Sequence, residues 1–378
     1  MNPYTGLLSV LLPPAEQTLL LQAALLPGRK GLEALFSWQN IISDFGIYFK
    51  GEDRGIKRIL PMVYENLRPV AEDIPPALRT ILRTAHLREE LRANTIRLQI
   101  TPVLEALIEE IIDFQVLKGL ALACDVYPSY TLRHIHDIDL YVPQASHANL
   151  IRILDRFNGE LSWETKPGDP VSYTLPSGLP ILLHGNYFCY PAYHFPEPPV
   201  EHKRNLIIFD NSVSVLPPEL MLVHLLGHAA VSQSRRTAQY VIDAVLLLGT
   251  YALNWEIVLQ TIEDANTILP ASVQLEYLQR SFAVGIPAYV FEKLGKDARE
   301  MPARYVEAAI DGARRGKTTP LGKLLECADN GLSRKALLKW MLAPSPELFI
   351  WQGRISEKKQ AIPYMLRRPF HFLGRLLR

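Results

Sequence analysis

The chain has 378 residues, of which 48% are hydrophobic and 21% charged, and its formal net charge is +1. This composition is typical of a folded globular protein, and the length predicts two or three domains. The near-zero charge excludes a strong overall attraction to nucleic acid, and three cysteines are too few for a disulfide framework or a zinc site.

The cysteine usage and the N-terminal segment together predict where the protein works. Few and scattered cysteines suit a reducing compartment. The leucine-rich N-terminal segment is interrupted by Pro13 and Pro14, too early for a membrane span, and no signal peptide is evident. We therefore expect a cytoplasmic protein without a transmembrane segment.

Residues 1–112 predict an N-terminal helical region, because apolar residues recur there at three- and four-residue spacing. Pro102 lies inside the last and longest segment, and we expect it to kink that helix or to split it in two. The predicted helices are Leu19–Leu26, Leu32–Asp44, Gly55–Leu67 and Pro76–Ile112.

Residues 113–215 show the shorter periodicity of strands and predict a small α/β domain with a mixed sheet. Turn residues such as Pro167 and Gly168 separate the apolar runs, and one helix, His147–Phe157, is expected among them. The predicted strands are Phe114–Leu117, Asp137–Val142, Ser162–Thr165, Val171–Leu175, Pro180–Phe188 and Asn205–Phe209.

The first of these strands leads directly into an anion-binding pattern. Lys118 and Gly119 follow the strand Phe114–Leu117, and the run Leu120–Ala123 favours a helix. A strand, a glycine turn and a helix place free backbone N–H groups and the positive helix end beside the strand tip. Lys118 adds a point charge that suits a phosphate.

The second strand carries two acidic residues, Asp137 and Asp139, inside an apolar run. The two-residue period of a strand points both carboxylates to the same face. Adjacent carboxylates repel, so such a pair indicates a bound cation, and oxygen ligands suit Mg²⁺ bound together with phosphates. The alternative is that Asp137 closes a turn and Asp139 caps a solvated strand edge. The anion-binding turn beside the pair favours a site for a nucleotide and a metal.

Two histidines flank the entry to this strand. If the strand already runs through His134 and His136, alternation places both on the face opposite Asp137 and Asp139. On that reading neither histidine faces the site.

Residues 216–378 predict a C-terminal helical bundle that ends in a basic tail. His224 and His228 share one helix face, where core packing is favoured over a metal role. Asp243 lies in an apolar helix and requires a partner, for which Arg235 or Arg236 is near in sequence. The tail 367–378 mixes arginine with large apolar residues. Such a segment can pack on the protein's own surface, on a membrane surface or on a partner. The predicted helices are Glu219–Ser232, Ala238–Leu248, Trp255–Ala265, Ser272–Ala283, Ala303–Ala313 and Leu321–Cys327.

These motifs together resemble a bacterial family of uncharacterised nucleotidyltransferases within the DNA polymerase β-like nucleotidyltransferase superfamily. The resemblance extends over residues 20–270 and more weakly into the tail 364–378. Its segments are Val116–Leu122, Tyr127, Arg133, Asp137–Val142, Leu182–His184, Leu222–Ala230, Val241–Ala244 and Asn254–Glu256.

The resemblance implies a nucleoside triphosphate (NTP) held around Gly119, with Mg²⁺ or Mn²⁺ bridging Asp137, Asp139 and the phosphates. Lys118 and Arg133 then offset charge that develops on the phosphates. An acceptor hydroxyl attacks the α-phosphate, as in related phosphoryl-transfer sites.

One position departs from the family pattern. The superfamily usually carries a third carboxylate on a neighbouring strand, and Leu182 stands at that position here. His184 is a candidate general base, because a neutral imidazole titrates in a suitable range. Glu164 or Asp243 is an alternative source of the missing carboxylate.

The sequence as a whole predicts an α+β protein, with a small mixed-sheet nucleotidyltransferase core between a helical region and a helical bundle. We expect a Mg²⁺-dependent enzyme that binds ATP or another NTP and transfers its nucleoside monophosphate to a hydroxyl on a small molecule, sugar, peptide or protein. The rival functions are a non-catalytic nucleotide sensor or scaffold, and a toxin-like enzyme that modifies tRNA. The second rival requires a basic groove that the net charge does not favour.

Overall fold

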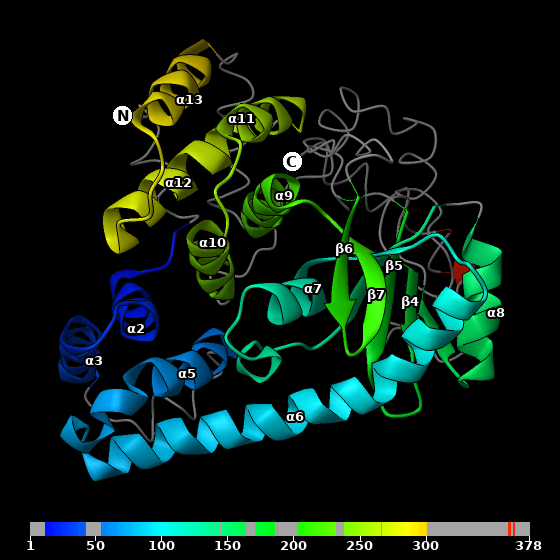
Figure 1. The fold of residues 1–378 in the computed structure, drawn as a ribbon, viewed down its shortest axis with the longest axis horizontal. Helices are drawn as coiled ribbons and strands as arrows, with labels where there is room; N and C mark the ends of the chain where they lie inside the picture. Colours follow the sequence, from blue (N-terminus) through cyan, green and yellow to red (C-terminus); the bar gives the residue numbers. More distant parts are fainter. Residues whose placement is uncertain are drawn as a thin grey trace.

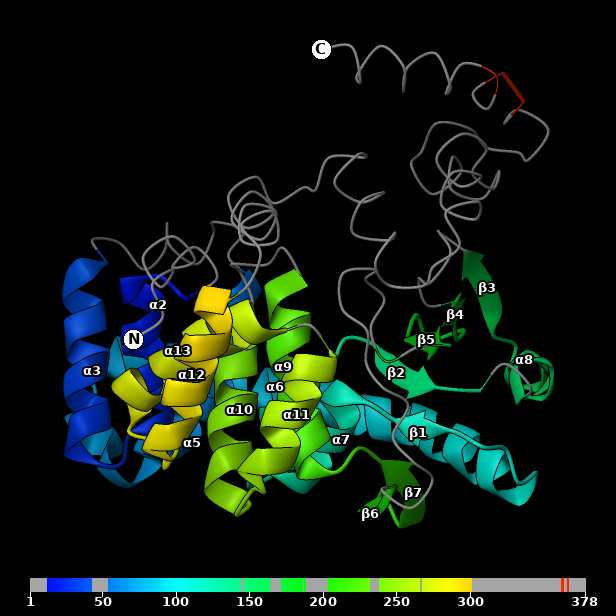
Figure 2. The same ribbon diagram turned by 90° about the horizontal axis from the view of Figure 1, so that it is seen from above.

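The computed structural model shows an α+β protein with one mixed β-sheet and many helices, and it confirms the predicted fold class (Figure 1). Most helices gather at one end of the molecule and the sheet lies at the other, with one long helix running along both (Figure 2). The structure describes residues 12–42, 54–143, 146–163, 171–185, 187, 203–231, 238–265, 267–300, 362–363 and 366.

The N-terminal part is helical as predicted. Helix α6 continues through Pro102 without the predicted split. Proline removes the hydrogen bond to the carbonyl of Leu98, and Leu98 is 77% exposed, so water can reach that turn of the helix. The elements are α2 (Ala15–Leu25), α3 (Arg29–Ile41), α5 (Arg54–Leu67), the 3₁₀ helix η2 (Arg68–Asp73) and α6 (Pro76–Glu109).

Seven strands form the sheet in the order β3-β4-β5-β2-β1-β7-β6. The pairs β2–β5 and β1–β7 are parallel, and the other neighbours are antiparallel. The strands are β1 (Gln115–Val116), β2 (Ile138–Tyr141), β3 (Glu160–Trp163), β4 (Val171–Thr174), β5 (Pro180–His184), β6 (Arg204–Ile208) and β7 (Asn211–Val215).

Strand β7 was not predicted, because its turn from β6 contains no glycine. Phe209 and Asp210 form that turn with φ of 49° and 69°. Positive φ at both central residues is the geometry of a tight two-residue hairpin, which glycine or asparagine usually provides. Phe209 is retained there by packing, since its ring contacts Tyr130 edge to face and lies under the guanidinium of Arg97.

Two helices and a short 3₁₀ turn belong to the sheet region. Helix α7 (Lys118–Asp125) packs against β2 and β6, and α8 (His147–Arg156) packs against α6. The turn η3 (Tyr130–Leu132) leads from α7 toward β2 and contacts both α6 and α7. Thus α7 lies between the sheet and the remaining helices (Figure 1).

The C-terminal helices include one that was not predicted, α13. The predicted segments Ala303–Ala313 and Leu321–Cys327 and the basic tail 367–378 lie outside the described residues. The described helices are α9 (Pro218–Val231), α10 (Gln239–Thr250), α11 (Trp255–Asp264), α12 (Ile268–Phe282) and α13 (Ala288–Glu300).

The N-terminal and C-terminal helices pack against each other, although they are far apart in sequence. Helix α2 contacts α10 and α12 as well as α3 and α5. The hydroxyls of Thr18 and Tyr277 lie 3.1 Å apart, and Gln22 donates a hydrogen bond to the carbonyl of Ser281. None of the described helices combines the length and the apolar character needed to cross a membrane.

Candidate active site

The turn from β1 into α7 contains an unusual backbone conformation. Lys118 begins α7 with φ of 44°, a left-handed conformation that is costly for a residue with a side chain. No side chain caps the beginning of α7, so the amides of its first turn lie at an uncapped helix N-terminus. The amide of Leu117 donates to the carbonyl of Asp139 at 2.9 Å, which ties this turn to β2.

Asp139 lies at the centre of the site and is buried. Lys118 Nζ donates to Asp139 Oδ1 at 3.1 Å, and His184 Nε2 lies 2.6 Å from the same oxygen. Burial raises the pKa of Asp139, but these two partners outweigh it and hold the pKa well below the usual value. The carboxylate is therefore ionised and accepts both hydrogen bonds, so the proton of His184 is on Nε2.

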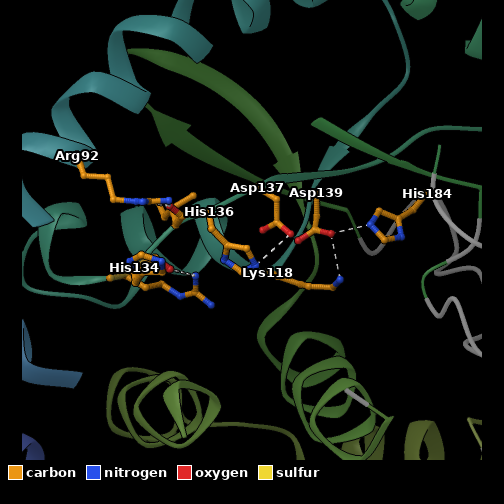
Figure 3. A network of polar contacts seen from close by, with 9 residues as sticks. Arg92, Lys118, His134, His136, Asp137, Asp139 and His184 are labelled. Atoms are coloured by element: carbon orange, nitrogen blue, oxygen red, sulfur yellow. Dashed lines mark hydrogen bonds and ion pairs between the residues drawn. The ribbon is translucent and has the colours of Figure 1, made fainter. Parts of the chain in front are cut away.

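Asp137 lies beside Asp139, just before β2 begins (Figure 3). Burial and the charge of Asp139 raise the pKa of Asp137 to about 6. The two carboxylates are thus close enough to repel each other, although Asp137 precedes the strand that carries Asp139.

The loop before Asp137 differs from the sequence-based reading. Strand β2 starts at Ile138, so the alternation of a strand does not extend back through the two histidines. His136 Nε2 lies 3.4 Å from Asp137 Oδ2, and the expectation that this histidine points away from the site is wrong. Partial desolvation and the charge of the nearby Arg58 lower the pKa of His136, although about half of its side chain is exposed.

Helix α6 holds this loop in place. Arg92 donates from Nε and Nη2 to the carbonyl of Ile135 at 2.9 and 2.8 Å. Glu89 accepts from Nδ1 of His134 at 2.9 Å. These contacts fix the backbone on the side of Asp137 away from α7.

Leu182 is the direct neighbour of Asp139 on β5, at the position where the sequence comparison expects a third carboxylate. Among the residues that the structure describes, no group of three histidine, cysteine or acidic side chains is arranged to hold a metal ion. Of the alternatives considered from sequence, Glu164 lies outside the described residues, and Asp243 is bonded to other side chains. His184 is the polar group that β5 brings to Asp139.

Arg133 and Asp243 form a buried ion pair that was not predicted. Arg133 donates from Nε and Nη2 to the two oxygens of Asp243, both at 2.8 Å. Tyr127 donates to Asp243 Oδ1 at 2.6 Å. The sequence analysis favoured a pair between Asp243 and Arg235 or Arg236, which lie outside the described residues; the expectation of a structural pair holds with a different arginine.

Arg133 also explains the glycine at the start of α7. A methyl group built on Gly119 lies 2.8 Å from Nη1 of Arg133, closer than real Cβ contacts allow. Burial lowers the pKa of Arg133, but the charge and hydrogen bonds of Asp243 outweigh it and raise the pKa above its usual value. The guanidinium is therefore charged and lies against the α7 turn.

His224 and His228 extend the polar surroundings of Lys118 from α9. His224 is fully buried, and its Nε2 donates to the carbonyl of Tyr187 at 2.7 Å. Burial and the nearby Lys118 lower the pKa of both histidines, that of His224 to about 3. Both rings are therefore neutral.

The chain belongs to a family described as uncharacterised nucleotidyltransferase, whose profile matches residues 56–283. The protein is accordingly an enzyme of the nucleotidyltransferase class. No curated protein sequence matches this chain.

Two solved structures are similar over about half of this chain. One is the antibiotic-resistance factor ANT(2'')-Ia, with 17% identity over 50% of this chain and 97% of its own, and a TM-score of 0.36. The other is an antigenic nucleotidyltransferase-like protein from Paracoccidioides brasiliensis, with 19% identity over 53% of this chain and 98% of its own, and a TM-score of 0.38.

Proposed function

We propose that the protein transfers a nucleoside monophosphate from an NTP, such as ATP, to a hydroxyl group of an acceptor, and that it requires Mg²⁺ or Mn²⁺. The observation that carries the proposal is the adjacent pair Asp137 and Asp139 beside the uncapped N-terminus of α7. The acceptor is a small molecule, sugar, peptide or protein, and the reaction takes place in the cytoplasm.

The acidic pair fits a divalent cation. Each charge raises the cost of ionising the other, and Asp137 has its pKa raised to about 6 by burial and by Asp139. Mg²⁺ commonly uses only one or two carboxylates and completes its shell with water and substrate phosphates, so Asp137 and Asp139 suffice. A divalent ion bound there neutralises the pair and polarises the phosphate.

Lys118, Gly119 and Arg133 are the proposed phosphate contacts. The uncapped amides around Gly119 suit an anion, and the absence of a side chain there lets the guanidinium of Arg133 pack against this turn. Lys118 Nζ is bonded to Asp139 at 3.1 Å, so its ammonium neutralises this carboxylate and lies next to the proposed phosphate position. Charge that develops on the phosphates is offset by these cations.

His184 is proposed to orient Asp139. Because its Nε2 proton is donated to Asp139 Oδ1 at 2.6 Å, this nitrogen is engaged with the carboxylate. The contact supports an orienting role for this nitrogen in place of the general-base role expected from sequence, as outer hydrogen bonds do for other metal-binding groups.

A second candidate function is NTP binding without transfer, as in a sensor or scaffold. Leu182 beside Asp139 favours it, because a site with two carboxylates has fewer groups to activate an acceptor. Equilibrium binding does not distinguish the two functions, since both require it. Release of pyrophosphate does, since only the transferase produces it.

The experiment is a pyrophosphate-release screen of the four NTPs with Mg²⁺ or Mn²⁺ against hydroxyl-bearing acceptors. We expect release by the wild type and its loss in Asp137→Asn and Asp139→Asn, which keep the side-chain shape and remove the charge. Glu72→Gln is the matched control, because Glu72 has a side chain 96% exposed and lies outside the site. Full release by Asp139→Asn contradicts the proposed site, and NTP binding without release under every condition favours the sensor.

A further inference from the structure

The start of α7 is in contact with a buried triad of side chains from separate segments. Arg133 is held by both oxygens of Asp243 on α10, and Tyr127 donates to the same carboxylate. The side chains of Arg133 and Asp243 are only 11% and 2% exposed. A two-pronged, buried contact of this kind leaves the guanidinium one orientation.

That orientation directs the third nitrogen of Arg133 toward the α7 turn. Nη1 lies beside Gly119, where an added methyl group approaches it to 2.8 Å. Within the described residues the hydrogen bond of Nη1 goes to the carbonyl of His134 at a long 3.4 Å. Since Nη1 carries two N–H groups, it retains donor capacity on the side of the turn where the uncapped amides of α7 lie.

We propose that Asp243 and Tyr127 are positioning residues for the nucleotide. They hold Arg133 so that Nη1 and the first amides of α7 donate to the same phosphate of an NTP. This inference rests on the proposed function, because it takes Arg133 as a phosphate contact. It adds a residue from α10 and one from the loop after α7 to the nucleotide site, although neither touches the ligand.

The other end of α7 provides a matched control. Asp125 there binds Arg204 of β6 and accepts a hydrogen bond from Tyr251 at 2.6 Å, so the same three residue types meet again. Seven residues of helix separate Lys118 from Asp125, which is about 10 Å along the axis. Loss of either tyrosine hydroxyl removes a hydrogen bond to a carboxylate that also binds an arginine, but only Tyr127 is connected to the proposed phosphate contact.

The test compares the Kd for each NTP with Mg²⁺, measured by calorimetry, and the Tm in wild type, Tyr127→Phe and Tyr251→Phe. We expect both variants to lower the Tm, and Tyr127→Phe to lower it more, because the hydroxyl of Tyr127 is buried and that of Tyr251 is only partly buried. Tyr127→Phe weakens binding about three- to tenfold, the range of a single hydrogen bond, and Tyr251→Phe leaves the Kd unchanged. Asp243→Asn weakens binding further; if it does not fold, the pair of tyrosine variants still decides.

Equal Kd values for Tyr127→Phe and wild type overturn the positioning role while the proposed function stands. If the wild type binds none of the four NTPs with Mg²⁺, the proposed function fails and the positioning role fails with it. A raised Kd in both tyrosine variants also overturns the inference, because a general destabilisation of α7 then explains the effect.

Discussion

Replacement of Gly119 by alanine tests whether the α7 turn and Arg133 are packed as tightly as the structure indicates. The added methyl group lies 2.8 Å from Nη1 of Arg133. A flexible side chain ordinarily gives way at little cost, but this guanidinium is held by two hydrogen bonds to Asp243. Moving it weakens a buried ion pair, and moving the backbone disturbs the beginning of α7.

The magnitude follows from two opposing effects. Overpacking a buried position costs about 1–3 kcal/mol. Alanine is favoured over glycine inside a helix by up to ~1 kcal/mol, and this gain is smaller at a helix end. We expect Gly119→Ala to lower the free energy of unfolding by about 1–2 kcal/mol, which lowers the Tm of a chain of this length by ~1–2 °C for each kcal/mol.

The assay is thermal melting of the wild type, Gly119→Ala and the control Gly295→Ala. Gly295 lies in the middle of α13, and a methyl group built there has no atom within 4 Å outside its own helix, so the control is expected to raise the Tm. The Kd for NTP with Mg²⁺ is also expected to rise in Gly119→Ala, because the methyl group displaces Arg133, the proposed phosphate contact. If Gly119→Ala raises the Tm as much as the control and leaves binding unchanged, the packing argument is refuted.

Two further predictions concern single side chains. Lys118→Gly and Lys118→Ala both remove the ammonium from Asp139, but the backbone φ of 44° at this position suits only glycine. The glycine variant is therefore expected to be more stable than the alanine variant by ~1 kcal/mol in thermal melting. Equal stability of the two variants contradicts the left-handed conformation. Burial raises the pKa of the Cys124 thiol from 9.0 to about 12. In a variant that carries Cys189→Ser and Cys327→Ser, iodoacetamide at pH 8 is therefore expected to alkylate Cys124 about a thousandfold more slowly in the folded protein than in the protein unfolded by urea. Its rate rises about tenfold per pH unit as the thiolate fraction grows, and fast labelling of the folded chain contradicts the burial of this thiol.

The sheet core and the acidic pair could be predicted from the sequence, because the patterns that indicate them lie in short, continuous segments. Strand β1, the Lys118–Gly119 turn and β2 follow one another within 27 residues, and each has its own apolar run or turn residue. Hairpin β6–β7 was only half predicted, since Phe209 and Asp210 replace the residues that usually mark such a turn.

The contacts that shape the site could not be predicted from the sequence, because they join segments that are far apart in the chain. Arg133 and Asp243 are 110 positions apart, so a search by sequence proximity selected Arg235 and Arg236 instead. The orientation of His136 depended on where β2 begins, and strand ends are the least certain part of a sequence reading. No local pattern indicates either feature.

The binding of Mn²⁺ tests most directly whether Asp137 and Asp139 form a metal-dependent nucleotide site. Electron paramagnetic resonance counts bound Mn²⁺ with a non-hydrolysable ATP analogue in wild type, Asp137→Asn, Asp139→Asn and the control Glu72→Gln. We expect Mn²⁺ to bind the wild type and the control with the analogue, and at least tenfold weaker binding in both asparagine variants. Equal Mn²⁺ binding by Asp139→Asn and the wild type would contradict the assignment of the site.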